Sequence, residues 1–579
     1  MTQMYDTDVL VIGTGPAGST LGLALATYGI KVQLFTQFAW LANSPRAHIT
    51  NQRAMEVLRD LGIEEQVKQI ATPWHEMGES LITTSLVGEE IARMSAWGTG
   101  DERYGDYLKG SPCPLVDLIQ PKMEALLVKN AAERGAIYNF NTEYLSHEQD
   151  EHGVTARFLN RITQQEFSLR AKYLVGMDGA RSKVVEELQL PLEGVMSRAG
   201  TVYVTFKADL SKYVQHRPAI LQWIVNPEAG FGDIGMGLLR AISPWNEWIM
   251  GWGFDISQGE PQVTQEQVQA RLDAFVGEHV EDVQIEKISY WYVNQTYATH
   301  YSKGRVFCGG DAVHRHPPSS GLGSNTCMQD AFNLAWKLAY AVKGWATADL
   351  LASYSDERAP VGKQIVARAN QSRFDYKYLK QVFGFDQGIT TQAQMLERIF
   401  AETEEAAQVR EQLYQALEIK HHEFNAQGVE LNQRYQSSAV IAEASEEVFA
   451  KDKELYLQAT TRPGAKIPHT WLVDSKGRKH STLDITGKGR FTLITGLSGK
   501  AWREAVEALN LDYLDVIQVG SREYRDVYAT WQAKAEIADN GAILVRPDGY
   551  IAWRMPTAVP AGQHEKLLKE VLQQLHLSL

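Results

Sequence analysis

The sequence predicts an α/β protein with three kinds of folded unit. At the start of the chain, a short apolar run, a glycine-rich turn, a helix and a second apolar run follow one another, as in a βαβ unit. Between about 196 and 290 the segments alternate in polarity and are rich in aromatic residues, which favours an antiparallel sheet. From about 456 onward strand-like and helical segments alternate again, which indicates a separate small α/β unit.

Length, charge and cysteine content narrow the class of protein. The chain has 579 residues, more than one hydrophobic core usually organises. Its formal net charge of −13 disfavours nucleic acid and anionic membranes as partners. Glycines and Lys31 interrupt the apolar stretch 9–34, so we expect no membrane span. Three cysteines without a CxxC pair, and a start that lacks the features of a signal peptide, favour the cytoplasm.

The first unit is expected to form one sheet from strands that are far apart in the sequence. Its short apolar runs are of the length and composition of buried parallel strands, and each is bounded by glycine or polar turn residues. The expected strands are 8–12, 32–35, 173–177 and 305–308, and the expected helices are 16–28 and about 328–342.

The rest of the chain is divided by composition. The segment 376–455 is rich in Gln, Glu and Ala, lacks strand signals and is read as a helical connector, with helical spacing over 392–420. We therefore expect a first domain at 1–375 with insertions at about 76–104 and 190–290, then the connector, then a last domain at 456–579. Further expected strands are 201–207, 220–225, 248–254, 491–495, 515–519 and 542–546, and further expected helices are 502–509 and 564–575.

The turn from Gly13 to Gly18 fits GxGxxG between a predicted strand and a predicted helix. In this motif the first glycine makes the turn, the second admits a pyrophosphate and the third allows close packing, while the helix N-terminus offers N–H groups to phosphate. A purely structural glycine turn is the alternative. The dinucleotide is either FAD or NAD at this point, because Thr36 and Gln37 stand where an acidic residue usually ends the second strand.

Two further motifs favour a flavin. The predicted strand 305–308 leads into Gly310-Asp311, whose carboxylate can bind a ribitol or ribose hydroxyl, and then into 321–325 at the start of a helix. Backbone N–H groups there suit the pyrimidine edge of a reduced flavin. Asp178-Gly-Ala-Arg-Ser follows the strand 173–177. Each motif alone could be a structural turn, but all three in this order indicate a flavin.

With these motifs, the chain resembles the single-component flavoprotein aromatic hydroxylases related to para-hydroxybenzoate hydroxylase. The resemblance covers nearly the whole chain and includes Pro45-Arg-Ala-His-Ile-Thr-Asn-Gln-Arg, the stretch 304–325, Ala359-Pro360 and the stretch 486–496. Within the family, the motifs are most similar to those of hydroxylases that act on chlorophenols and hydroxybiphenyls.

The resemblance implies a fold and a reaction. The fold is a Rossmann-like FAD-binding domain, an antiparallel-sheet substrate domain and a thioredoxin-like C-terminal domain. The reaction is ortho-hydroxylation of a phenol or chlorophenol to a catechol, in which FAD is reduced by NADPH or NADH and reacts with dioxygen to form a C4a-hydroperoxide. Hydroxylation of a larger phenolic, such as a hydroxybiphenyl, a resorcinol or a polyketide ring, remains an alternative. A flavin dehydrogenase or reductase and a non-catalytic flavin sensor are alternatives from other classes.

The resemblance also assigns residues to the FAD site. They comprise the GxGxxG turn, one residue just after the second strand, three residues between that strand and Asp178, the two aspartates of the other motifs, and the segment at the start of the long helix. Asp178 is also expected to help receive the nicotinamide. The predicted FAD residues are Gly13, Thr14, Gly15, Pro16, Ala17, Gly18, Gln37, Arg46, Ala47, Gln120, Asp178, Asp311, Pro318, Gly321, Leu322, Gly323, Ser324 and Asn325.

His48 is the candidate for acid–base chemistry. A phenol ionises near pH 10 and an unperturbed imidazole titrates near about 6.5, so a neutral histidine within hydrogen-bond reach can take the phenolic proton. The alternative is a histidine that only fills a pocket, and its place in the family motif favours catalysis. His314 and His316 have the spacing of a metal pair, but no carboxylate or cysteine cluster completes a site, and we expect no metal.

Three residues of the predicted antiparallel sheet resemble positions of the substrate cavity: Gln222, Trp223 and Arg240. A core tryptophan and an ion-paired arginine are the plainer alternatives. The last domain resembles the thioredoxin-like tail of several aromatic hydroxylases, and because no cysteine follows Cys327 it cannot perform dithiol exchange. We expect it to be structural and to stabilise a dimer or tetramer.

Overall fold

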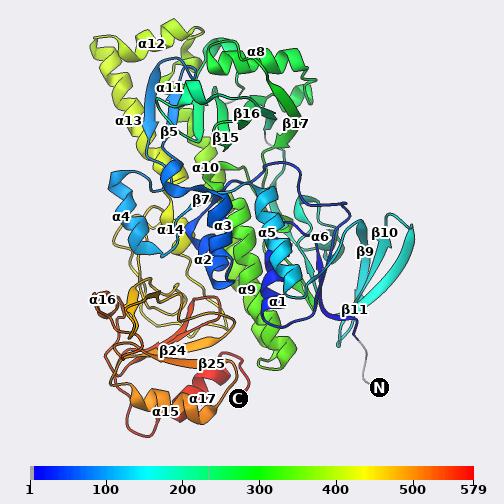
Figure 1. Ribbon diagram of the computed structural model, residues 1–579, viewed down its shortest axis with the longest axis vertical. Coiled ribbons are helices and arrows are strands. Elements are labelled where there is room, and N and C mark those ends of the chain that lie inside the picture. The colour runs from blue at the N-terminus through cyan, green and yellow to red at the C-terminus, as the bar shows by residue number, and fades with distance from the viewer. Residues whose placement is uncertain (1–4, 198, 233) are drawn as a thin grey trace.

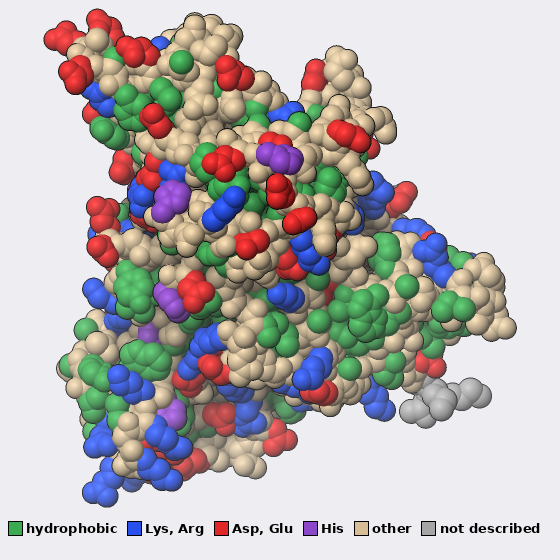
Figure 2. Space-filling view, turned by 45° about the horizontal axis from the view of Figure 1, so that its top comes forward, with side chains coloured by type: hydrophobic (Ala, Val, Ile, Leu, Met, Phe, Trp, Pro, Cys, Tyr) green, Lys and Arg blue, Asp and Glu red, His purple; other side chains and the backbone are tan. Residues whose placement is uncertain are grey.

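The computed structural model describes residues 5–197, 199–232 and 234–579, and it arranges them in three layers along the long axis (Figure 1). The antiparallel sheet and its helices lie at the top, the parallel sheet lies in the middle, and the last unit lies at the bottom. On the face that Figure 2 shows, acidic and basic side chains are interspersed over the middle of the surface. None of the helices in the described ranges combines the length and the apolar character needed to cross a membrane.

The middle layer is the expected single sheet, with strands in the order β19-β20-β11-β1-β2-β8, and it also contains antiparallel pairs. Strand β1 pairs in parallel with both β2 and β11, and β11 pairs in parallel with β20, so the predicted βαβ unit is confirmed. Strands β9 and β10 extend the sheet as an antiparallel excursion that the sequence analysis missed. The bounds are β1 Thr7–Ile12, β2 Val32–Phe35, β8 Ile137–Asn139, β9 Thr142–Gln149, β10 Val154–Asn160, β11 Gln165–Gly176, β19 Ser302–Lys303 and β20 Val306–Cys308.

Helices cover this sheet, and two small three-stranded sheets accompany it. The long helix begins at Gly323, five residues before the predicted start, because the first turn built from Gly323, Ser324 and Asn325 is already helical. A three-stranded sheet in the order β3-β7-β4 lies beside it. The bounds are α1 Pro16–Thr27, α2 Gln52–Asp60, α3 Glu64–Ile70, α4 Asp101–Gly110, α5 Gln120–Glu133, α6 Lys183–Leu188, α9 Gly323–Lys343, β3 Ile49–Thr50, β4 Thr72–Pro73 and β7 Val116–Asp117, with a second small sheet of β12 Leu192–Val195, β18 Gln295–Ala298 and β21 His314–Arg315.

The upper layer is a seven-stranded sheet in the order β17-β13-β16-β15-β14-β5-β6. The predicted antiparallel strands are confirmed, and the segment 76–104 adds β5 and β6 at one edge, where β5 pairs in parallel with β14. The bounds are β5 Ser80–Thr83, β6 Glu90–Met94, β13 Gly200–Lys207, β14 Leu221–Ile224, β15 Gly237–Ser243, β16 Glu247–Phe254 and β17 Gln284–Tyr292, with helices α7 Ser211–Val214 and α8 Gln265–Val276.

Helices of the 376–455 segment share a hydrophobic core with this sheet. Leu379, Ile399 and Leu413 belong to the same buried cluster as Trp248 of β16. The helical spacing predicted over 392–420 is confirmed. The structure divides this segment into two helices, because Thr403 caps the second one by accepting a hydrogen bond from the Ala406 amide. The bounds are α10 Ser353–Phe374, α11 Tyr376–Val382, α12 Gln392–Phe400, α13 Glu404–Phe424 and α14 Gln427–Leu431.

The last unit contains a four-stranded sheet in the order β25-β24-β26-β27. Strand β24 pairs in parallel with β25 and antiparallel with β26, and the predicted strands and helices of this unit are confirmed. Leu493 and Trp502 of this unit belong to the same buried cluster as Leu10 of β1, so the unit packs directly on the middle layer. Its thioredoxin-like identity stays a prediction. The bounds are β22 Trp471–Val473, β23 Lys479–Ser481, β24 Phe491–Thr495, β25 Leu514–Gln518, β26 Ala542–Val545, β27 Ile551–Met555, α15 Lys500–Leu509, α16 Thr530–Lys534 and α17 His564–Gln574.

Candidate functional site

The GxGxxG turn has the geometry of a phosphate-binding turn. Gly13 has φ +105°, and a Cβ on it would lie 2.1 Å from the Met177 carbonyl oxygen, so only glycine fits. A Cβ on Gly18 would lie 2.0 Å from the Gly13 carbonyl oxygen, so α1 approaches β1 closely. No side chain caps α1, whose first N–H groups therefore lack an intrahelical or side-chain acceptor. A pyrophosphate fits this helix end.

The two other glycine motifs lie next to this turn. Gly310 has φ +63°, and a Cβ on it would lie 3.0 Å from the Cβ of Ala17, which places the Gly310-Asp311 turn against the start of α1. The backbone of Asp178 also borders Gly13. The Asp178 carboxylate accepts a hydrogen bond of 2.5 Å from the Ser182 hydroxyl, and burial raises its pKa. Three segments that are distant in the chain thus converge, as the sequence analysis expected.

The start of α9 is tied to the strand that follows His48. The Asn325 side chain is buried; its oxygen accepts from the Asn51 amide at 3.0 Å, and its nitrogen donates to the Ile49 carbonyl at 2.8 Å. Gly321 has φ +60°, and α9 has no side-chain cap. The uncapped helix end and β3 form one wall, and its free N–H groups suit the pyrimidine edge of a flavin. Pro318 and Leu322 lie in the loop before α9, and Gly323 and Ser324 are the first two residues of that helix.

Among the remaining predicted FAD residues, Gln120 contacts Ala47, and its partner Glu124 lies beside Gly15 of the GxGxxG turn. The Gln120 side chain donates to Glu124 at 2.7 Å, and the Gln120 amide donates to the Ala47 carbonyl at 2.9 Å. Arg46 is exposed, with its guanidinium carbon 5.7 Å from the centre of the Trp291 ring. Gln37 is exposed just after β2. The sequence analysis missed Glu124, whose carboxyl pKa is raised by burial, because no motif marks it.

His48 lies at the junction between the parallel sheet and the antiparallel sheet, in contact with Asp117. Its Nδ1 is 3.5 Å from the Asp117 carboxylate, long for a hydrogen bond, and its side chain is 9% exposed. Strand β3 follows His48 directly and pairs with β7, which ends at Asp117. On the other side of Asp117, the Arg240 guanidinium from β15 donates to the carboxylate at 2.5 Å. Three side chains from distant segments therefore lie in one row, with Asp117 between His48 and Arg240.

Burial and the Arg240 charge together favour the neutral imidazole of His48. Burial lowers the pKa of His48, the Arg240 charge lowers it further, and Asp117 opposes both, with a net decrease from the ordinary 6.5. Burial would raise the pKa of Asp117, but Arg240 and His48 outweigh that effect and the pKa is lowered. With Nδ1 facing the carboxylate, the tautomer with a proton on Nδ1 is favoured, and Nε2 is left with a lone pair that can accept a proton.

Aromatic side chains surround the Arg240 end of the row. The Trp223 ring lies 4.9 Å from that of Tyr376, and the Arg240 guanidinium carbon lies 5.9 Å from the centre of the Trp97 ring. Burial raises the pKa of Tyr203 to about 12, so its hydroxyl is protonated at neutral pH. A flat apolar ring fits such surroundings.

The structure separates Gln222 from the other two predicted substrate residues. In the register of β14 with β15, Leu221 is opposite Arg240 and Gln222 is opposite Leu239, so Gln222 and Arg240 are on opposite faces of the sheet. Gln222 is buried, and its side-chain oxygen has no hydrogen-bond partner among the described residues. Trp223 and Arg240 are on the same face.

Replacing Arg240 by methionine should move the acid limb of the pH–rate profile to higher pH. The Arg240 charge lowers the pKa of His48, so its removal raises that pKa, and the imidazole becomes protonated and unable to accept a proton at a higher pH. The measurement is kcat/KM against pH, with a phenol, the substrate class that the resemblance of the sequence implies. Arg240→Lys keeps the charge and should leave the acid limb near that of the wild type. An acid limb that stays in place in Arg240→Met would contradict the role given to Arg240.

Asp117 is a second site residue that the sequence analysis missed. It ends the two-residue strand β7, and its importance comes from contacts with His48 and Arg240, which are 69 and 123 residues away in the sequence. His314 and His316 do not form a metal site with a third ligand in the part of the chain that the structure describes, where no cluster of three such ligands is found. His314 instead contacts Asp330, with Nε2 at 2.8 Å from the carboxylate.

Comparisons with known proteins agree with this geometry. Residues 6–369 match the family described as FAD binding domain, and residues 460–575 match the family described as aromatic-ring hydroxylase, C-terminal. The chain is 46% identical to a 2,4-dichlorophenol 6-monooxygenase of Cupriavidus pinatubonensis, over 97% of this chain and 95% of that protein. It is 44% identical to a phenol 2-monooxygenase of a Pseudomonas species, over 96% of this chain and 91% of that protein.

A solved structure extends the similarity to the whole fold. The flavin-dependent monooxygenase PieE, in complex with FAD and substrate, superimposes with a TM-score of 0.93 at 40% sequence identity, over 99% of this chain and all of that one. The similarity therefore includes the antiparallel sheet and the last unit as well as the parallel sheet.

Proposed function

Because this chain belongs to the family of FAD-dependent aromatic-ring hydroxylases, we propose that it hydroxylates a phenol, and specifically a chlorophenol, at the ortho position to give a catechol. It is an enzyme that uses FAD, with a reduced nicotinamide and dioxygen as co-substrates. The names of the relatives at 46% and 44% identity support a phenol rather than a larger ring as the substrate.

The single observation that carries the proposal is the neutral His48 beside the Asp117–Arg240 pair. The pair lies where the flavin-binding layer meets the aromatic wall around Trp223. A phenol with its ring against that wall can present its hydroxyl to Nε2 of His48. Hydroxylation ortho to an oxygen is faster when the ring is electron-rich, and removal of the phenolic proton makes it so.

Each residue then has a physical role. His48 accepts the phenolic proton at Nε2, Asp117 orients the imidazole and stabilises the imidazolium that forms, and Arg240 keeps the carboxylate ionised. The uncapped starts of α1 and α9 and the turn at Gly310-Asp311 would hold FAD, together with Arg46 and Gln120. Bound FAD supplies the activated oxygen when reduced. Overall, one phenol, one dioxygen, one NAD(P)H and one proton give one catechol, one NAD(P)⁺ and one water.

Coupled turnover tests the proposal. A panel of phenol, chlorophenols and hydroxybiphenyl is added to the FAD-loaded protein with NADPH or NADH, and nicotinamide oxidation, dioxygen uptake and catechol formation are measured together. The expected result is substrate-stimulated oxidation, with dioxygen consumption and catechol matched to NAD(P)H and little peroxide. Oxidation of nicotinamide without catechol would instead indicate a flavin dehydrogenase or reductase. A preference for hydroxybiphenyl would point to the larger ring.

The proposal includes a setting for the enzyme. Cys113, Cys308 and Cys327 are free and buried, which supports a reducing compartment such as the cytoplasm. We propose that the chain comprises a first domain at 1–375, a helical connector at 376–455 and a thioredoxin-like last domain at 456–579. We also propose that it assembles as a dimer or tetramer. Size-exclusion chromatography with light scattering would test the assembly, and a monomer would contradict it.

A further inference from the structure

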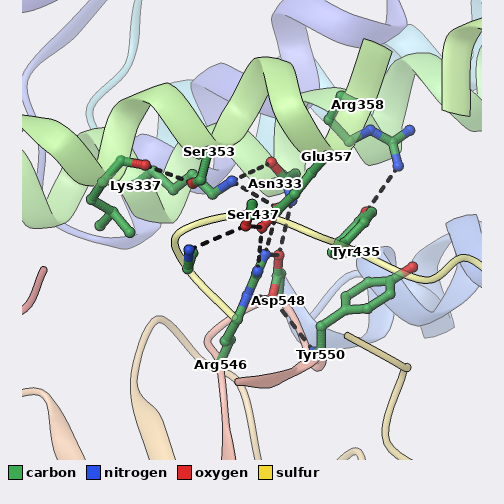
Figure 3. A network of polar contacts seen from close by, with 12 residues as sticks. Asn333, Lys337, Ser353, Glu357, Arg358, Tyr435, Ser437, Arg546, Asp548 and Tyr550 are labelled. Atoms are coloured by element: carbon green, nitrogen blue, oxygen red, sulfur yellow. Dashed lines mark hydrogen bonds and ion pairs between the residues drawn. The ribbon is translucent and has the colours of Figure 1, made fainter. Parts of the chain in front are cut away.

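A buried chain of ion pairs connects the last unit to the two long helices of the flavin-binding layer (Figure 3). Arg546, just after β26, donates to both carboxylate oxygens of Glu357 in α10, at 2.5 and 2.8 Å. Lys337 of α9 donates to the same carboxylate at 2.8 Å. These three side chains are fully buried. Buried charges are retained only when they are fully paired, so this contact fixes how the units sit together.

A separate set of contacts links the last unit to Arg358, the next residue of α10. Its guanidinium donates to Gln433 at 2.8 Å and to the Tyr435 hydroxyl at 2.9 Å. Tyr550 of the last unit donates to Gln433 at 3.1 Å and stacks on the Tyr435 ring with 4.1 Å between ring centres. The last unit therefore holds Arg358 through two intermediate side chains, as Figure 3 shows for Tyr435 and Tyr550.

Arg358 in turn holds Asp330, which is completely buried in α9. The Arg358 Nε–H group donates to one oxygen of Asp330 at 2.7 Å. The other oxygen accepts from the Gly310 amide at 3.0 Å and lies 2.8 Å from Nε2 of His314. Burial would raise the pKa of Asp330, but Arg358 and His314 outweigh it, and the carboxylate is ionised. One carboxylate thus joins Arg358 to both sides of the turn that presents Asp311.

We propose that Asp330 is a positioning residue of the FAD site, which holds the Gly310-Asp311 turn in the shape that FAD requires. Arg358 fixes Asp330, and contacts with the last unit through Gln433 and Tyr435 fix Arg358. The turn needs such a support because Gly310 is in a left-handed conformation and lies against Ala17 of α1, where the phosphates of FAD are expected. The carboxylate of Asp330 accepts a hydrogen bond from the Gly310 amide and so ties this peptide to α9. The inference rests on the FAD binding of the proposed function and is independent of which phenol is the substrate.

Asp330→Asn tests the proposal in the FAD-free protein and on FAD binding. Asparagine has the same shape but loses the charge that holds the Gly310 amide. In the FAD-free variant, hydrogen exchange of the segment 306–315 should become faster than in the wild type. In an FAD titration followed by flavin fluorescence and visible circular dichroism, the dissociation constant should rise by about 10- to 100-fold, as expected for one lost hydrogen bond to a charged group. Neither readout depends on hydroxylation.

Glu357→Gln is the matched control. Glu357 is buried like Asp330 and is adjacent to Arg358, but its hydrogen-bond partners among the described residues are Arg546, Lys337, Asn333 and Ser437, and none of them is in the Gly310 turn. The control should lower the melting temperature and leave the exchange of 306–315 and the FAD dissociation constant within about twofold of the wild type. Unchanged FAD binding in Asp330→Asn would overturn the proposal. Equal weakening in both variants would also overturn it, because the effect would then be general destabilisation.

Arg358→Lys keeps the proposal testable if Asp330→Asn does not fold. Lysine preserves the charge that ionises Asp330 but loses the fixed guanidinium geometry that links it to Gln433 and Tyr435. FAD binding should weaken by about 3- to 10-fold, with faster exchange over 306–315 in the FAD-free protein. If Arg358→Lys behaves as the wild type in both measurements, Asp330 does not depend on Arg358 and the proposal is wrong.

Discussion

Replacing His48 by alanine should lower kcat/KM for a simple phenol by about 100-fold or more at pH 7, and the loss should shrink as the pH rises toward about 10. In the wild type the imidazole takes the proton, so the rate does not depend on ionisation of the free phenol. In the variant only the phenolate that forms in solution is reactive, and its fraction falls tenfold for each pH unit below the phenol pKa. The effect therefore has a defined pH signature as well as a size.

Substrate acidity separates proton transfer from packing. A phenol whose electron-withdrawing substituents make it ionised at pH 8 should be hydroxylated by His48→Ala at a rate close to that of the wild type. If the variant instead loses activity equally with acidic and ordinary phenols, His48 only shapes the pocket. His75→Ala is the control variant, because its side chain is 79% exposed, and it should leave the profile unchanged. A pH–rate profile in His48→Ala that matches the wild type would remove His48 from the mechanism.

The parts of the site that the sequence predicts are those fixed by local backbone geometry. Gly13 and Gly310 must be glycine because each has a positive φ and a close neighbour, so the motif letters carry the structural information. The same is true of the strand before each turn, whose apolar run is long enough to be recognised. His48 could be named because it lies in a long family motif, not because its surroundings were visible.

The parts that the sequence does not predict depend on pairing between distant segments. Asp117 ends a two-residue strand with no periodicity, and only the pairing of β7 with β3 brings it to His48. Gln222 and Trp223 are adjacent in the sequence and were predicted together, yet the pleat of β14 directs them to opposite faces. Which face of β14 is directed toward the flavin-binding layer depends on how the antiparallel sheet packs on that layer, and this packing is a tertiary property.

The role of the last unit is also a tertiary property. No sequence motif marks Arg546, Glu357 or Asp330, but the structure joins them through α9 and α10 to the turn that presents Asp311. The last unit, although it has no cysteine, therefore contributes to the structure of the flavin-binding layer, because it packs on that layer through fully buried charged side chains. This arrangement makes the stability of that layer depend on the last unit.

Arg546→Met should lower the free energy of unfolding by about 3–5 kcal/mol, because it leaves buried carboxylates without their main partner. Arg546 is fully buried and bonds both Glu357 and Asp548, and without it Lys337 would be the cation left to compensate Glu357 among the described residues. The measurement is the denaturant midpoint and slope of the unfolding transition, compared with wild type. Arg478→Met is the matched control from the same unit, because its side chain is 66% exposed and its solvent-screened pair with Asp474 should contribute little to stability.

The pH dependence of this variant gives a second check. Burial would raise the pKa of Glu357, but Arg546 and Lys337 outweigh it, and the pKa is lowered from the ordinary 4.5. A carboxyl with a lowered folded-state pKa contributes stability that is present above its unfolded-state pKa and is lost as the pH falls through the folded-state pKa. Without Arg546 that pKa rises, so the variant lacks this contribution at neutral pH, and its stability should approach that of the wild type as the pH falls below about 4.5. A deficit that stays constant from pH 7 down to the acid range would show that lost packing, and not charge, accounts for the effect of Arg546.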